Sequence, residues 1–250
     1  MTLPFFRRGF GSLTSAEDRL GRLRKVLDRA NVKYMRNAPE AALYRLPVVD
    51  SPLRPLRRQM QKFRFPLAMP ARVAMFEGGF LADGAIRQFA ARDASKLQEY
   101  VPEALVLPLQ LALTLADQKQ RRLLELPHLT TAVVVLTSLE DTPLEDHHRT
   151  LIWRAFGVPL FEQLQGWDGS VIARECEVHD GLHIEEDAVI FEKAGEELVA
   201  TQLTAFEEPI LRARTGVTGT IVTQHCECGA ETPRLRNLAS IHTKVRAAVA

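Results

Sequence analysis

The stretch that decides the fold is Thr131-Ala132-Val133-Val134-Val135-Leu136, near the middle of a chain of 250 residues. Its residues are apolar or β-branched at every position, a pattern typical of a parallel strand buried on both faces. A helix is expected next, with Thr142 as its N-cap, Pro143 in its first turn and Gly157 just past its end. Another extended segment begins at Phe161. This order of strand, helix and strand predicts an α/β protein.

The pattern continues in both directions from this strand. Upstream, Arg72–Phe76 is expected to form a short strand, and helices are expected around Asp83–Asp93 and Leu105–Leu126. An apolar stripe at helical spacing from Leu20 to Ala30 predicts a surface helix that lies on a core. The last third of the chain is expected to be mainly β, in the segments Ala188–Glu192, Glu197–Leu203 and Gly219–Thr223.

Charge is distributed unevenly, although the formal net charge is only +1. Residues 1–65 contain 15 Lys/Arg and 5 Asp/Glu, whereas the remainder contains 17 Lys/Arg and 26 Asp/Glu. The basic segment 1–65 can bind nucleic acid or an anionic membrane. It can also dock on the acidic part of its own chain or on a partner protein. No nucleic-acid-binding module accompanies the charge, which favours docking over nucleic acid.

Cysteine usage indicates the compartment and the kind of cross-link. Three cysteines cannot form a complete set of disulfides, and the first residues contain no apolar run typical of a secretory signal. The best candidate for a membrane segment, Glu103–Ala116, is interrupted by Pro108 and is too short to span a bilayer. We therefore expect a cytoplasmic protein without a membrane segment, in which clustered Cys and His favour a metal over a disulfide.

The cysteines cluster with histidines in one part of the chain. Three thiolates and one imidazole would complete a closed tetrahedral zinc site, and closed sites of this kind are structural. His179 and His225 compete for the position of the fourth ligand, and three free buried cysteines are the alternative to a metal site. The predicted ligands of a structural zinc ion are Cys176, His183, Cys226 and Cys228.

Two other candidate sites are weaker. Gly9–Ser15 is rich in Gly, Ser and Thr, but it has no Lys and follows no strand, so it does not match a phosphate-binding loop. His147 and His148 lie among acidic residues, where a metal or acid–base site is conceivable. The position at the start of the expected helix instead favours a solvated first turn whose acidic groups offset the helix dipole.

Several motifs in the last third of the chain resemble the phenylacetate–coenzyme A ligase family of adenylate-forming enzymes. In some members of that family a zinc ion is held at the positions that match the four predicted ligands. The resemblance implies a reduced N-terminal domain of an adenylate-forming enzyme, of class α/β, with a β-rich zinc-binding subdomain. The motifs are Glu175-Cys176, Asp180–Ile184, Glu197–Leu203, Pro209–Gly216, and Cys226-x-Cys228-Gly229 with Thr232-Pro233-Arg234.

The chain departs from the family at the nucleotide site. The loop that holds the ATP phosphates is missing, and the motif Tyr-Gly-Leu-Ser/Thr-Glu is replaced by Leu164-Gln165-Gly166-Trp167-Asp168. Val217 stands where the family has the Asp that binds the ribose. Asp168 and Arg214 are all that the resemblance leaves of a nucleotide site. Because the chain ends at Ala250, the family's mobile C-terminal domain with its catalytic Lys is not expected.

These patterns predict three regions: a basic helical N-terminal arm (1–66), an α/β core (67–160) and a β-rich zinc-binding region (161–250). Loss of several charge-stabilising groups together predicts that the chain does not form adenylates alone. It is then expected to act by binding a protein partner or a second copy of itself, or by holding an acyl or nucleotide ligand; ATP and coenzyme A have little support as cofactors. The alternative is an ATP-dependent acyl- or aryl-CoA ligase that another chain completes.

Overall fold

The computed structural model describes residues 16–241 apart from 53–55, 59, 77–78, 82–83, 140, 142 and 205–206. The helices are α1 (Ala16–Arg29), α2 (Pro39–Leu43), η1 (Ala91–Lys96, a 3-10 helix), α3 (Leu97–Tyr100), α4 (Leu109–Gln120) and α5 (Asp146–Phe156). The first strands are β1 (Gln61–Lys62), β2 (Val73–Met75), β3 (Phe80–Leu81), β4 (Ile86–Gln88), β5 (Ala104–Pro108), β6 (Ala132–Ser138) and β7 (Leu160–Gln165). The later strands are β8 (Val171–Glu175), β9 (Leu182–Ile184), β10 (Val189–Ala194), β11 (Glu197–Gln202), β12 (Ile210–Val222) and β13 (Arg234–Ser240).

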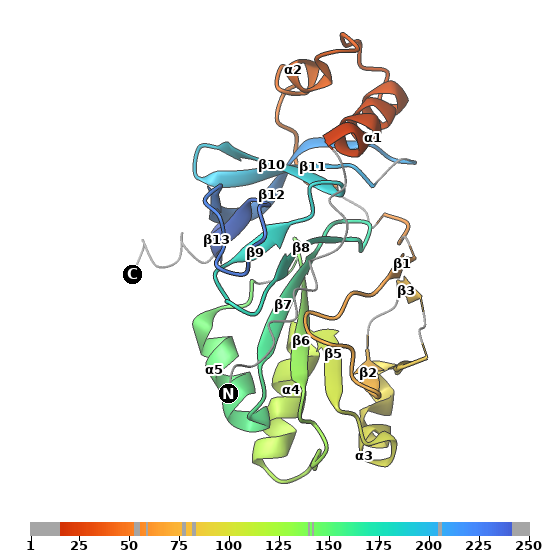
Figure 1. The fold of residues 1–250 in the computed structure, drawn as a ribbon, viewed down its shortest axis with the longest axis vertical. Coiled ribbons are helices and arrows are strands. Elements are labelled where there is room, and N and C mark those ends of the chain that lie inside the picture. Colours follow the sequence, from red (N-terminus) through yellow and green to blue (C-terminus); the bar gives the residue numbers. More distant parts are fainter. Residues whose placement is uncertain are drawn as a thin grey trace, which may run out of the picture.

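One long sheet organises the molecule (Figure 1). Within the described residues its order is β10-β11-β12-β13-β9-β8-β7-β6-β5-β2-β4. Strands β4, β2, β5, β6 and β7 are mutually parallel and form the parallel half. From β7 to β10 every neighbouring pair is antiparallel, and β8 to β13 form the antiparallel half. Figure 1 shows α4 and α5 beside the parallel half and α1 and α2 beyond β10 and β11.

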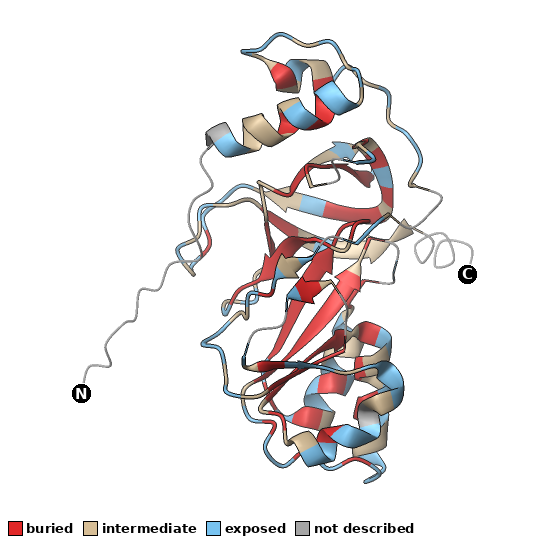
Figure 2. Cartoon of the chain, turned by 90° about the vertical axis from the view of Figure 1, so that its right-hand side faces the viewer, coloured by how far each residue is buried: buried red, intermediate tan, exposed pale blue. Residues whose placement is uncertain are grey.

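The buried strand expected at Thr131–Leu136 is confirmed as β6, at the centre of the parallel half. Val133 and Val135 join the core beneath α4 and α5, whereas Val134 and Leu136 join a second core on the opposite face. Figure 2 shows the central strands coloured as buried while the helices are exposed on their outer sides. Burial of both faces explains the unbroken apolar run.

Two of the predicted helices need correction. The helix expected around Asp83–Asp93 is wrong, because Ile86–Gln88 form β4 at the sheet edge and Ala91–Lys96 form η1. The helix expected at Leu105–Leu126 exists only as α4, and its first residues belong to β5, all buried from Ala104 to Leu107. Short apolar runs of this kind fit a buried strand and a buried helix equally well, so periodicity does not separate them.

The helix after β6 begins later than predicted. Pro143 lies before it, and Thr142 is outside the described residues. Glu145 is the N-cap of α5 and forms a capping box with His148, whose Nδ1 accepts a hydrogen bond of 3.3 Å from the backbone N–H of Glu145. Gly157 has φ +68°, which confirms it as the left-handed residue that ends the helix. His148 therefore serves the helix start, in line with the structural interpretation of this pair of histidines.

The basic arm docks on the acidic antiparallel half. Arg19 approaches Glu186 at 3.0 Å and Arg22 approaches Asp187 at 3.4 Å. These contacts fit the docking interpretation of the uneven charge. They are partly exposed, so the apolar contact beneath them supplies most of the stabilisation. That contact consists of Leu23, Leu27, Leu43, Ile190 and Leu203.

Leu27→Ala should lower the free energy of unfolding by about 2–5 kcal/mol, since it removes a fully buried side chain and leaves a cavity. Denaturant unfolding followed by circular dichroism measures the change. Met35→Ala is the control, because Met35 is 67% exposed and its replacement should change stability by no more than about 0.5 kcal/mol. Equal losses in the two variants would contradict the docked position of α1.

The boundary expected between residues 160 and 161 falls at the start of β7. This strand pairs with β6 from Leu160 to Gln165, so one sheet runs without interruption from the predicted core into the predicted zinc-binding region. None of the helices among the described residues combines the length and apolarity needed to cross a membrane.

Candidate metal centre

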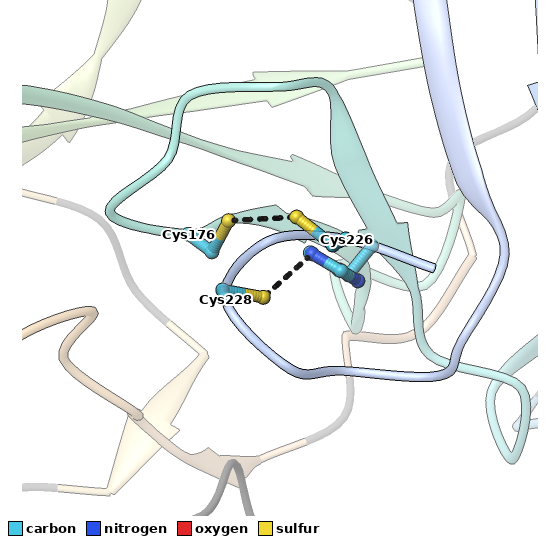
Figure 3. Close-up of side chains that lie close together, drawn as sticks. Cys176, Cys226 and Cys228 are labelled. Atoms are coloured by element: carbon cyan, nitrogen blue, oxygen red, sulfur yellow. Dashed lines mark hydrogen bonds between the residues drawn. The ribbon is translucent and has the colours of Figure 1, made fainter. Parts of the chain in front are cut away.

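The structure brings the four predicted metal ligands together. One candidate ligand atom from each residue lies within 4.8 Å of the others. The Sγ atoms of Cys176 and Cys226 are 3.8 Å apart, and the Sγ atom of Cys228 is 3.4 Å from Nε2 of His183. Figure 3 shows the three cysteine side chains converging from two loops.

Two of the separations between these atoms match the edges of a tetrahedral zinc site. Zinc–sulfur bonds of about 2.3 Å place two sulfur atoms about 3.8 Å apart, and a sulfur and a nitrogen ligand about 3.6 Å apart. The observed separations of 3.8 Å and 3.4 Å agree with those edges of the tetrahedron. Three sulfur atoms and one imidazole nitrogen are also the donors that zinc prefers. The residue types and these two separations therefore fit a tetrahedral zinc ion.

Adjacent strands position the ligands. Cys176 directly follows β8, His183 lies within β9, and the other two cysteines lie in the loop between β12 and β13. Gly229 turns this loop with φ +85° and donates its N–H to the carbonyl of Cys226 at 2.9 Å. Gly181 has φ +88°, and a Cβ there would lie 2.5 Å from the carbonyl oxygen of Leu235. Gly181 is therefore required by its positive φ and by the close approach to Leu235, and Gly229 is required by the positive φ of its turn.

Burial sets the protonation of the ligands in the absence of a cation. Cys176 is fully buried, and burial raises the pKa of its thiol to about 12. Burial, reinforced by the charge of Arg234, lowers the pKa of His183. The imidazole is therefore neutral and ready to bind a metal. A divalent cation would favour the thiolate forms, because only the thiolate is a strong metal ligand.

The two competing histidines have other contacts. The ring of His179 stacks on Phe161 at 4.9 Å between centroids, and its Nδ1 lies 3.1 Å from Oε1 of Glu175. The backbone carbonyl of His225 accepts a hydrogen bond from Arg234. Neither residue belongs to the group of four, so the geometry favours His183 as the imidazole ligand.

A buried cluster of charges adjoins the metal centre. Arg149 of α5 lies 3.2 Å from Oε2 of Glu162 and 3.1 Å from Oε2 of Glu175, the residue before Cys176. Thr137 donates a hydrogen bond of 2.8 Å to Oε1 of Glu162. Burial, opposed by Arg149, raises the pKa of Glu162 to about 7. Sequence reasoning missed this cluster; a Glu inside the buried run that starts at Phe161 was the available signal.

A narrow crevice is lined by residues from both the parallel half and the antiparallel half of the sheet. It lies at the carboxyl ends of β6 and β7, where ligands bind in open α/β sheets. Its cavity volume is about 10 Å³, enough for about one water molecule. Most of the described lining residues are apolar, and Glu162 is the one carboxylate among them. The lining residues are Thr137, Ser138, Leu139, Pro143, Glu162, Leu164, Phe191, Leu198, Val217, Leu235 and Leu238.

Asp168 and Arg214, the two residues predicted as a nucleotide remnant, are both held by the protein. Asp168 is buried and accepts hydrogen bonds from the backbone N–H and hydroxyl of Ser170 and from the side-chain amide of Gln202. Arg214 pairs with Glu197 at 2.6 Å. No contact joins Asp168 to Arg214 in the part of the chain that the structure describes. Their role in nucleotide binding stays a prediction.

Comparison with known proteins identifies the fold. No family model and no curated protein matches the sequence. Among solved structures, 2-hydroxyisobutyryl-CoA ligase with 2-HIB-AMP and CoA in the thioesterification state has a TM-score of 0.64 and 14% identity, over 91% of this chain and 69% of that chain. Its postadenylation state with 2-HIB-AMP has a TM-score of 0.64 and 13% identity, over 94% and 73%. Its open conformation has a TM-score of 0.52 and 15% identity, over 88% and 48%.

These likenesses show that the chain shares its fold with 2-hydroxyisobutyryl-CoA ligase. This chain spans about half the length of 2-hydroxyisobutyryl-CoA ligase when it is compared with the open conformation of that enzyme. At such low identity the likeness establishes the fold, and the specific resemblance to the phenylacetate–coenzyme A ligase family stays a prediction. Activity, metal content and partners are matters of proposal.

Proposed function

We propose that this protein is a non-adenylating relative of adenylate-forming enzymes, stabilised by a structural zinc ion, that acts by binding a partner. One observation carries the proposal. At the carboxyl ends of β6 and β7, where the fold would place a nucleotide, the crevice has a volume of about 10 Å³ and is lined by Leu164 and Val217. A nucleotide requires far more space and a set of cationic or N–H groups aimed at its phosphates.

The metal belongs to the scaffold in this proposal. Four protein ligands close the tetrahedron, so zinc would join the loop after β8 to the loop between β12 and β13 and supply no reaction chemistry. A binding role also agrees with Trp153 of α5, whose side chain is 60% exposed and of a type enriched in protein interfaces.

A second candidate is an acyl- or aryl-CoA ligase that another chain completes. The observation in its favour is the fold match itself, which covers 91% of this chain with a CoA ligase. The groups absent around the crevice would then come from the second polypeptide. Recovery of activity upon mixing with a second chain is the result that would distinguish this candidate from the first.

ATP–pyrophosphate exchange with a mixture of carboxylic acids tests the proposal. The chain alone should give no exchange above a protein-free control, since removing even one charge-stabilising donor commonly costs about 100- to 1,000-fold in rate. A working adenylate-forming enzyme in the same mixture controls for the assay. Sustained exchange by the isolated, zinc-loaded chain would overturn the non-adenylating role. Titration with acyl-CoA and ATP, followed by calorimetry, separately measures binding without turnover.

A further inference from the structure

Arg234 is a fully buried arginine that lies where the two metal-binding loops meet. It begins β13, with Val222 of β12 as its partner on one side and His183 of β9 on the other. The residue is only about 1% exposed, which is rare for an arginine. Its two terminal nitrogens find acceptors, whereas Nε has none among the described residues.

The acceptors of Arg234 come from both loops. On the first loop, Nη1 donates to the carbonyl oxygen of Asp180 at 3.0 Å and forms a short ion pair with the Asp180 carboxylate. On the second loop, Nη2 donates to the carbonyls of Gln224 at 3.1 Å and His225 at 3.4 Å. His225 directly precedes Cys226. One planar guanidinium group therefore joins the loop after Cys176 to the loop that carries the other two thiols.

Thr232, two residues earlier, acts on the imidazole ligand. Its Oγ1 lies 3.1 Å from Nδ1 of His183. When Nδ1 donates its hydrogen to this hydroxyl, Nε2 carries no hydrogen and is free to bind a metal. Nε2 is the atom that faces Cys228, at 3.4 Å. A partner for the second ring nitrogen is a common requirement of histidine metal ligands.

We propose that Arg234 is a positioning residue of the metal centre, that it holds the two ligand loops at the separation the metal requires, and that Thr232 orients the imidazole. This inference rests on the proposed zinc ion. It assigns no role to Arg234 or Thr232 as ligands. The guanidinium group is needed because its donors diverge in one plane, whereas a lysine ammonium is a compact point charge that cannot reach both loops in the same way.

The test uses the full chain, stripped of metal and reloaded with Co²⁺, whose thiolate charge-transfer absorption reports tetrahedral sulfur ligation. Competition with a chelator then gives the affinity. Arg234→Met should bind Co²⁺ about 10- to 100-fold more weakly than the wild-type protein, with altered absorption, and Arg234→Lys should not restore it. Arg236→Met is the matched control. Arg236 contacts the same Asp180 carboxylate but no carbonyl of the second loop, so this variant should keep wild-type affinity.

A second pair of variants keeps the test decisive if Arg234→Met does not fold. Thr232→Val should weaken Co²⁺ binding by about tenfold, and Thr232→Ser, which keeps the hydroxyl, should restore it. Wild-type affinity in folded Arg234→Met, or equal affinity in Thr232→Val and Thr232→Ser, would overturn the positioning role. A wild-type protein that takes up no Co²⁺ would overturn the metal centre itself, which distinguishes failure of the proposed zinc from failure of this inference.

Discussion

Replacing Cys226 with serine should abolish stoichiometric zinc binding and destabilise the whole protein. The side chain of Cys226 is one of the four proposed zinc ligands, and its Sγ atom lies 3.8 Å from that of Cys176. A ligand that binds only the folded state stabilises it by about 4 kcal/mol when its free concentration is about 1,000 times the dissociation constant. The loss should be large, because the proposed zinc ion would join loops between β8, β9, β12 and β13, four strands of the antiparallel half.

Elemental analysis and thermal unfolding check this prediction together. The wild-type protein should contain about one zinc ion per chain, and Cys226→Ser should contain almost none. A chelator should lower the melting temperature of the wild-type protein and leave that of Cys226→Ser unchanged, which separates loss of metal from loss of packing. A metal-free wild-type protein with an unchanged melting temperature would contradict a structural role for zinc.

The second large effect is a pH dependence caused by Glu162. Its pKa is raised from 4.5 to about 7 by burial, the leading cause. Between these two pH values the folded protein binds a proton that the unfolded chain releases. The contribution of Glu162 to the free energy of unfolding is therefore fully present below about pH 4.5 and is lost as the pH rises through about 7. A shift of this size corresponds to about 3 kcal/mol. In Glu162→Gln this contribution disappears, and the difference in stability between wild type and variant should change by that amount.

Urea unfolding at several values between pH 4.5 and 7.5 measures this difference. Glu196→Gln is the control: Glu196 is exposed in a turn, and its replacement should leave the slope of stability against pH as in the wild type. Because other groups also titrate, the relevant quantity is the difference between the two proteins at each pH. Parallel curves for wild type and Glu162→Gln would show that Glu162 is ionised throughout this range.

The clustering of Cys176, His183, Cys226 and Cys228 could be predicted from the sequence, because few residue types bind zinc and all three cysteines lie within about 50 residues. The sequence also identified β6 because burial on both faces leaves an unbroken apolar run. It did not reveal β5 as a strand, since Leu105 and its neighbours fit a helix equally well. The partners of Glu162 come from β6, α5 and β8, and Arg234 contacts Asp180, more than 50 positions away. Contacts of this kind depend on the packing of distant segments, which periodicity does not encode.

Strand β13 links two places that have been described separately. It begins with Arg234, beside the two loops that carry the proposed metal ligands. The next residue, Leu235, lines the crevice, and its carbonyl oxygen lies close to Gly181. A movement of β13 that widened the crevice would therefore pull on the loops that bind the metal. Thermodynamic coupling of this kind is reciprocal. Loss of the metal is thus expected to loosen the crevice. If the metal changes the affinity of the crevice for a molecule by some factor, that molecule must change the affinity for the metal by the same factor.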